Sequence, residues 1–146
     1  MRLLIQRVKQ AQVSVNDEIC GKIGRGLLVF LAIHKDDTLD KIDPLAAKLL
    51  HLRIFPDAQG KMNLNVHQIK GNILVISQFT LYANCFTGRR PDFTQAAPPE
   101  LATRLYESFI SRLSQMANQK IQTGLFGKLM EVSLINEGPA TFFLEK

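Results

Sequence analysis

The stretch from Leu27 to Ile33 is the strongest constraint on the fold, because it contains seven consecutive apolar residues. A run of leucine, β-branched and aromatic residues with no polar face is typical of a strand that is covered on both sides. The run is far shorter than the roughly 20 apolar residues that a membrane-spanning helix needs. It therefore predicts a sheet with another layer packed on it, and no membrane insertion.

Segments on either side of this run are expected to supply more of the sheet and its cover. Apolar and polar residues alternate from Ala11 to Ile23 around a turn at Asn16–Asp17, which predicts a hairpin. Leucines at helical spacing predict a helix from Thr38 to Leu52. In this helix Pro44 either belongs to the first turn or marks a kink after Asp43, with Asp43 as the cap.

A second helix and further strands complete the pattern. Pro98–Pro99 suit the opening of a helix, and an apolar stripe with helical period follows them. A buried strand is expected at Ile73–Ile76, and closing strands from Met130 to Leu144 with an interruption at Asn136–Pro139. The order is two strands, two strand–helix units and three strands. We therefore expect an α+β (mixed α/β) fold in one domain, residues 1–146, with a largely antiparallel sheet and two main helices packed on one face.

Composition narrows the functional classes. The chain carries 18 Lys and Arg against 13 Asp and Glu, a modest positive excess that suits a polyanion such as RNA. Cys20 and Cys85 form no Cys-x-x-Cys pair and the three histidines share no metal-ligand spacing, so we expect reduced thiols, no metal and no cofactor. The first nine residues mix charges with apolar side chains and cannot form a signal-peptide core. We therefore expect a cytoplasmic protein.

Polar and aromatic side chains follow the strand at Ile73–Ile76, where it should reach the surface. Strand ends at a cleft commonly present backbone N–H groups and side chains to a ligand; alternatively, these residues only cap the strand's last hydrogen bonds. Ser77 and Thr80 are candidate nucleophiles by residue type alone, because no Gly-x-Ser-x-Gly elbow accompanies them. No Walker-type phosphate loop is present either.

The dipeptide Gly138–Pro139 is unusual for a different reason. An X–Pro bond is one of the few places where a chain can be fixed in the cis form and aim its carbonyl groups in an uncommon direction. Its spacing alone indicates a turn that ends a strand.

Two stretches of the sequence carry a family resemblance: Ser77-Gln78-Phe79-Thr80-Leu81-x-Ala83 and Asn136-x-Gly138-Pro139-x-Thr141. They resemble the two signature motifs of the D-aminoacyl-tRNA deacylase (D-Tyr-tRNA deacylase) family. Further matching stretches, in order along the chain, are Ile5–Val8, Gly26–Val29, Lys35–Asp37, Leu52–Phe55, Gly60–Val66, Arg90–Phe93 and Gln122–Phe126. Several ordered motifs over nearly the whole chain make the resemblance specific.

The resemblance implies a homodimer that hydrolyses the ester joining a D-amino acid to the 3′ end of tRNA, with glycyl-tRNA as a further family substrate. It implies active sites at the subunit interface. There Gly138–Pro139, with a cis peptide bond, enters the partner's pocket and leaves no room for an L side chain. Asn136 and Thr141 belong to the same motif, and Met130 is expected at the adenosine end of the pocket.

The same resemblance assigns the chemistry to four consecutive residues. Backbone N–H groups near Phe79 and Thr80 would donate hydrogen bonds to the developing oxyanion, while Ser77 and Gln78 would line the pocket. The 2′-hydroxyl of the terminal adenosine would do most of the proton work. Thr80 is either a nucleophile or a group that orients the substrate, and the second role is favoured.

Arg89 and Arg90 form the densest basic pair, within a segment of residues 84–97 that has no regular period. They are expected to contact tRNA phosphates, or else to belong to a solvated loop. Asp92 and Ala140 depart from the serine and valine that are usual in the family. The alternative function is a non-enzymatic nucleic-acid-binding module on the same fold.

Overall fold

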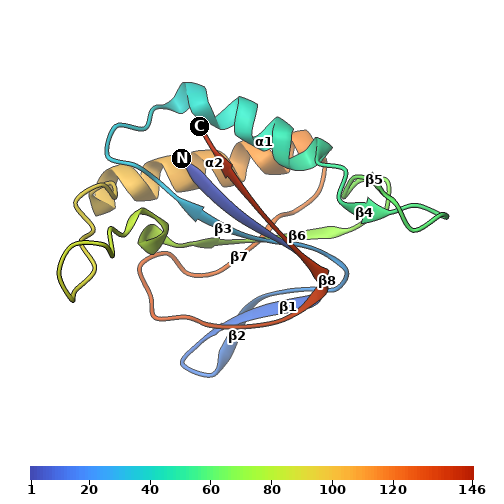
Figure 1. The fold of residues 1–146 in the computed structure, drawn as a ribbon, viewed down its shortest axis with the longest axis horizontal. Helices are drawn as coiled ribbons and strands as arrows, with labels where there is room; N and C mark the ends of the chain where they lie inside the picture. Colours follow the sequence, from blue (N-terminus) through green and yellow to red (C-terminus); the bar gives the residue numbers. More distant parts are fainter.

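The computed structural model describes residues 1–146, and its centre is a six-stranded sheet with strand order β2-β1-β3-β6-β7, in which β8 pairs with the other edge of β1 (Figure 1). The strands are β1 (Arg2–Val15), β2 (Glu18–Ile23), β3 (Gly26–Ala32), β6 (Asn72–Ser77), β7 (Gln122–Thr123) and β8 (Glu131–Glu145). A separate two-stranded sheet joins β4 (Phe55–Pro56) to β5 (Met62–Leu64).

Strand β1 organises the antiparallel part of this sheet. Its first half pairs with β3, its second half pairs with β2, and β8 runs antiparallel along both halves. Only the pairs β3–β6 and β6–β7 are parallel. The expected largely antiparallel sheet is therefore confirmed.

Both α-helices, α1 (Ile42–His51) and α2 (Pro99–Ala117), cover the same face of the sheet, the upper one in Figure 1. Their apolar stripes pack against alternate residues of the central strands, and Leu49, Phe109 and Leu113 are completely buried. This packing forms the larger core cluster, with 23 buried residues. The prediction of two main helices on one face is confirmed.

A smaller core lies on the opposite face of the sheet. The β1–β2 hairpin and the first half of β8 curl under β3 and β6, so that Val13, Leu28 and Leu74 meet there in a second apolar cluster. Strand β3 thus has Leu27, Leu28 and Val29 fully buried on alternating faces. This double cover is what the apolar run predicts.

Two boundaries differ from the sequence-based expectation. The segment from Thr38 starts as the 3₁₀ helix η1 (Leu39–Lys41), and α1 then begins at Ile42, so Pro44 lies in the first turn and Asp43 is not the cap. Strand β8 is not interrupted at Asn136–Pro139: it continues to Glu145, and its extra residues are absorbed by a shift in register opposite Gln6–Val8. A bulge can accommodate additional residues without ending a strand.

Asp37 ties the two ends of the described chain to the loop between β3 and α1. Its buried carboxylate accepts hydrogen bonds from the Met1 amino group (2.8 Å), Lys41 Nζ (2.8 Å) and the His34 N–H (2.7 Å). The Met1 amino group also donates to the Lys146 carbonyl at 2.8 Å. Burial opposes ionisation of Asp37, but hydrogen bonds from Lys41 and the amino group outweigh it and lower the pKa of the carboxyl.

We expect Asp37→Asn to lower the free energy of unfolding at pH 7 by about 3 kcal/mol, because it leaves a buried amino group without its counter-charge. Since the Asp37 pKa is lower in the folded state, its contribution is present above the unfolded value near 3.9 and is lost as pH falls through the folded value. Urea denaturation between pH 7 and pH 3 should show this acid-dependent loss in the parent chain and not in the variant. The exposed neighbour Asp36→Asn is the control, and equal effects of the two substitutions would contradict the role of Asp37.

Candidate functional site

A cavity of about 400 Å³ opens where β6 ends, between the end of β3 and the start of α2. Ser77, Gln78 and Phe79 line it on one side. The remaining wall is almost entirely apolar and is formed by Leu31, Ala32, Ile33, Phe93, Ala96, Ala97, Pro99, Ala102, Tyr106, Phe126 and Gly127. Apart from Tyr106, the polar side chains of the cavity wall are therefore those of Ser77 and Gln78, at the end of β6.

The backbone at this point leaves hydrogen-bond donors without intrahelical partners. The Gln78 N–H continues the parallel ladder by donating to the Leu31 carbonyl at 2.8 Å, and the chain then turns into the 3₁₀ helix η2 (Phe79–Tyr82). The first bond of that helix is donated by the Leu81 N–H to the Gln78 carbonyl at 3.2 Å. The N–H groups of Phe79 and Thr80 precede this bond, so the helix offers them no acceptor.

Side chains around this turn are arranged without a base. Gln78 Nε2 donates a hydrogen bond to Thr80 Oγ1, and no charged group or histidine contacts that hydroxyl. The Phe79 ring is half-exposed and meets Phe93 edge-on, with ring centroids 5.0 Å apart. The arrangement can hold an uncharged ring and present N–H donors to an oxygen atom, but it contains no nucleophile–base pair.

Tyr106 is the only residue with a titratable side chain in the cavity wall. Its hydroxyl donates to the Val75 carbonyl at 2.9 Å, and burial raises the Tyr106 pKa. The phenol is therefore neutral over the ordinary pH range and serves to anchor α2 on β6. The wall of this cavity therefore contains no carboxylate, imidazole or amine that could transfer a proton.

The second motif occupies the bulge of β8. The Gly138–Pro139 peptide is cis, and both residues are exposed in the single chain. Arg7 supports the bulge from below: Nε donates to the Glu137 carbonyl at 3.0 Å, and the guanidinium is almost fully buried. Asn136 Nδ2 donates to the carbonyls of Arg7 (3.0 Å) and Ala140 (3.1 Å), which holds the bulge to β1.

The two motifs lie at opposite ends of β6. Opposite the β8 bulge, Val8 of β1 pairs with Gly26, and Gly26 pairs with Asn72 at the start of β6. Ser77 is at the other end of the same strand. Five steps of strand correspond to roughly 16 Å, so within one chain Gly138–Pro139 cannot share a cavity with Ser77.

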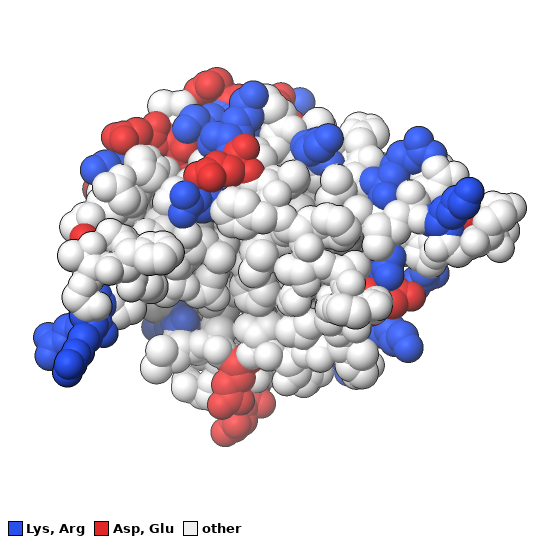
Figure 2. Space-filling model, viewed as in Figure 1, with Lys and Arg blue, Asp and Glu red and all other residues white.

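The other predicted site residues fall into three places. Thr141 accepts a hydrogen bond from Gln6 Nε2 at 3.2 Å beside the β8 bulge. Met130 packs at Gly124 under the β1–β2 hairpin and does not line the cavity at Ser77. Arg89 and Arg90 are exposed in a loop closed by mutual backbone hydrogen bonds between Asn84 and Asp92, and Figure 2 shows basic side chains at the corresponding tip on the left.

Several residues of the two sites are not identified by sequence reasoning. Tyr106 and Ala102 face the cavity from α2, yet in the sequence they are part of an ordinary helical pattern. Arg7 looks like one of several surface cations, and only its position in a matching stretch, Ile5–Val8, marks it. No group of three His, Cys, Asp or Glu side chains is placed to hold a metal ion. None of the helices combines the length and apolar content needed to span a membrane.

A family model and two named relatives match nearly the whole chain. The family model described as D-Tyr-tRNA(Tyr) deacylase matches residues 4–145. A protein of Protochlamydia amoebophila named D-aminoacyl-tRNA deacylase is 54% identical over 145 residues, which cover 99% of this chain and 95% of the relative. One of Haemophilus influenzae with the same name is 52% identical over 144 residues, covering 99% of each.

Solved structures show the same fold. A structure titled c-Myc DNA Unwinding Element Binding Protein superimposes with a TM-score of 0.93 at 38% identity, covering 100% of this chain and 99% of the other. A probable eukaryotic D-amino acid tRNA deacylase does so with a TM-score of 0.86 at 19% identity, covering 98% of each. The chain belongs to the D-Tyr-tRNA(Tyr) deacylase family, and the resemblance seen in its motifs is confirmed.

We expect Gly138→Ala to lower the free energy of unfolding by about 1–3 kcal/mol. Gly138 has φ of +131°, a conformation that residues with a side chain rarely adopt, and an added Cβ would lie 2.6 Å from Arg7 Nη2. Gly24→Ala is the matched control, because a Cβ there meets no atom within 4 Å. Urea denaturation of both variants checks the prediction, which fails if their midpoints shift equally.

Proposed function

We propose that this chain hydrolyses the ester bond between a D-amino acid and the 3′-terminal adenosine of tRNA. The observation that carries the proposal is the end of β6, where Ser77, Gln78 and Phe79 line an apolar cavity. The chain then enters a 3₁₀ turn whose first N–H groups, those of Phe79 and Thr80, have no acceptor in that helix. Such a site suits an aminoacyl ester of tRNA, because the neighbouring 2′-hydroxyl of the substrate can transfer the proton that no side chain here can. Family membership and relatives named D-aminoacyl-tRNA deacylase support the same reaction.

The reaction needs orientation and oxyanion stabilisation more than side-chain acid–base chemistry. Water attacks the ester carbonyl carbon, the new C–O bond forms, and the bond to the ribose 3′-oxygen breaks to release the amino acid and tRNA. The N–H groups of Phe79 and Thr80 donate to the carbonyl oxygen as it becomes negative, a type of contact worth about 10²–10³ in kcat. The neighbouring 2′-hydroxyl of the substrate relays the proton from water to the leaving oxygen.

Thr80 is assigned a role in orienting the substrate. Its hydroxyl already accepts a hydrogen bond from Gln78 Nε2, and no residue contacts it that could remove its proton. An unactivated threonine is a weak nucleophile at neutral pH. Ser77 and Gln78 line the cavity beside it, and the half-exposed Phe79 ring offers a face for the adenine.

Selection against L-amino acids is assigned to Gly138–Pro139 of a second copy of the chain. This dipeptide is exposed and lies at the far end of β6 from its own cavity, so it can reach such a cavity only across a subunit interface. In a two-fold homodimer each copy would give one bulge and receive one. The inserted backbone would occupy the space that an L side chain needs, while D-amino acids and glycine fit.

The tRNA body is assigned to the basic loop. Arg89 and Arg90 are exposed on a loop that adjoins the cavity through Phe93, and the chain has a net positive charge. Phosphate contacts from such side chains give affinity and orientation without reading sequence. Charged tRNA is used in the cytoplasm, which is the location that goes with this function.

The experiment that tests the function compares D-Tyr-tRNA with L-Tyr-tRNA as substrates of the purified protein. We expect release of D-tyrosine and negligible release of L-tyrosine. Mass spectrometry of the quenched reaction should find no acyl adduct on Thr80 or Ser77, because water is the nucleophile. Binding of D-Tyr-tRNA without release of tyrosine would refute the enzymatic assignment.

A mixed dimer tests whether one site uses two chains. Ala102→Phe fills the cavity, and Pro139→Glu places a charged side chain at the tip of the bulge, so each homodimer should be inactive on D-Tyr-tRNA. A dimer with one chain of each kind contains one intact cavity facing one intact bulge, and we expect about half of the parent activity with L-Tyr-tRNA still rejected. A mixed dimer as inactive as the two homodimers would rule out a shared site, provided that gel filtration shows intact dimers.

A non-enzymatic nucleic-acid-binding role is the second candidate. It is favoured by one observation, the 38% identity to a protein titled as a DNA unwinding element binding protein. It predicts tight binding of DNA and no turnover of D-Tyr-tRNA. The deacylation assay therefore separates the two candidates directly.

A further inference from the structure

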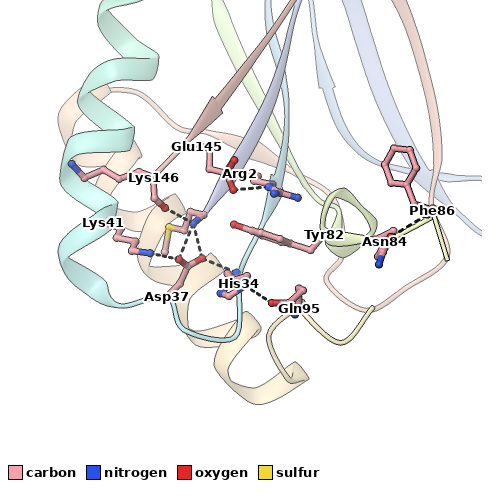
Figure 3. A pocket seen from close by; sticks show the side chains of 12 residues that line it. Arg2, His34, Asp37, Lys41, Tyr82, Asn84, Phe86, Gln95, Glu145 and Lys146 are labelled. Atoms are coloured by element: carbon pink, nitrogen blue, oxygen red, sulfur yellow. Dashed lines mark hydrogen bonds and ion pairs between the residues drawn. The ribbon is translucent and has the colours of Figure 1, made fainter. Parts of the chain in front are cut away.

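A second, more polar pocket of about 470 Å³ is lined by Tyr82 at the end of η2, whereas Phe79 at the start of η2 lines the apolar cavity. Figure 3 shows the side chains of this polar pocket. The pocket is open to solvent, and its walls come from both ends of the chain, the segment between β3 and α1, and the end of η2 with the segment that follows it. Met130 and the β8 bulge are not part of it. Nothing in the proposed ester hydrolysis uses this pocket.

Two pairs of neighbouring residues are divided between the two pockets. Ile33 faces the apolar cavity while His34 faces the polar pocket, and Ala96 and Gln95 divide in the same way. The His34 and Gln95 side chains are joined within the polar pocket by a hydrogen bond of 3.0 Å. A flexible chain whose last unit occupies the cavity would therefore have the polar pocket within reach of its preceding units.

The polar pocket offers a free aromatic surface. Phe86 is fully exposed on the loop that carries Arg89 and Arg90, and Figure 3 shows its ring at the edge of the pocket, apart from the other labelled side chains. Tyr82 is different, because its ring is already covered by Arg2 at 4.2 Å and faces His34 at 5.0 Å. Phe86 makes no comparable contact, so a ligand that stacks on its ring would bury apolar surface that is exposed in the free protein.

Two amide groups supply directional donors. The Asn84 Oδ1 accepts from the Phe86 N–H at 3.0 Å, which leaves the Asn84 NH₂ without an acceptor in the chain. The Asp36 N–H donates to His34 Nδ1, so the His34 proton is on Nε2 and is donated to Gln95 Oε1. The Gln95 NH₂ is likewise left free, and both groups can donate to base carbonyls or phosphate oxygens.

The charges of the pocket do not repel an anion. Asp37 is neutralised by the Met1 amino group and Lys41, and Glu145 is paired with Arg2 at 2.8 Å. Both acids that line the pocket are therefore already paired. Arg89 and Arg90 extend the positive charge along the neighbouring loop, at the basic tip seen in Figure 2.

We propose that this polar pocket binds the single-stranded nucleotides that immediately precede the terminal adenosine of tRNA, with Phe86 stacking on a base. This rests on the proposed function, which places the terminal adenosine in the adjoining cavity. Proteins that bind single-stranded nucleic acids combine basic side chains with aromatic rings on which bases stack. Phe86 and the basic loop provide this combination, and the free amide groups lie next to them. The pocket adds affinity for tRNA and leaves the chemical step unchanged.

The test uses Phe86→Ala, Phe86→Tyr and the control Leu129→Ala, which removes an equally exposed apolar side chain elsewhere. Two substrates are compared: D-Tyr-tRNA, and D-tyrosyl-adenosine, which lacks the preceding nucleotides. We expect Phe86→Ala to raise KM for D-Tyr-tRNA on the order of tenfold at unchanged kcat, since stacking on one base contributes that much. Its kcat/KM for D-tyrosyl-adenosine should equal the parent value, and Phe86→Tyr should restore KM.

The results that overturn the proposal are specific. An equal loss on both substrates would place Phe86 at the adenosine itself, and unchanged KM on both would leave the pocket without a role in tRNA binding. Calorimetric binding of the trinucleotide CpCpA, compared with adenosine 5′-monophosphate, provides a readout independent of catalysis. If the parent chain hydrolyses neither substrate, the proposed function is refuted. The binding measurement still tests the pocket, because weaker binding of CpCpA by Phe86→Ala than by Leu129→Ala would support it and equal binding would overturn it.

Discussion

Parallel pairing of β3 with β6 is the interaction on which the rest of the structure depends. The ladder runs in register from Gly26 and Asn72 to Leu31 and Ser77, and both strands are buried on both faces. Helices α1 and α2 cover one face and the curled β1–β2 hairpin covers the other. A Cβ at Gly26 would lie 1.9 Å from the Asn72 carbonyl oxygen, so the close approach at the start of this ladder requires glycine. Because the pair is rigid, whatever follows Ser77 is held at a defined place.

The same ladder separates the two functional motifs. Ser77 to Thr80 follow the end of β6, whereas the β8 bulge with Gly138–Pro139 is attached through β1 to its beginning. Arg7 and Asn136 each donate hydrogen bonds that hold that bulge in its exposed position. The bulge is firmly held but lies far from the cavity of its own chain. It is therefore suited to contact the cavity of a second copy. The proposed shared site follows from this separation.

The two pockets beside η2 differ in their chemistry, which suits them to different parts of the proposed substrate. The apolar cavity has no charged wall and its one phenol is held neutral, so it can bind a flat, uncharged group and surround a reacting ester with little water. The polar pocket has paired charges, free amide donors and an exposed ring, which suit nucleotides in contact with solvent. Only the 3₁₀ helix and two adjoining residue pairs separate these environments. In the function that we propose, hydrolysis depends on the apolar cavity and binding of the tRNA end depends on the polar pocket.

The sequence by itself determined the fold class, the doubly covered strand, the two helices on one face, and the two motifs that place the chain in its family, because apolar period and turn residues are local properties. It also led to the wrong expectation that the closing strands are interrupted at Asn136–Pro139, since glycine and proline usually end strands. The guanidinium that supports the continuous strand belongs to Arg7, 130 residues away in the sequence. Only the tertiary structure decided that Met130 lies away from the cavity, that Tyr106 and Ala102 line it, and that the motifs are at opposite ends of β6. Those facts depend on strand register and on which faces meet, and neither is encoded in the spacing of residues along one segment.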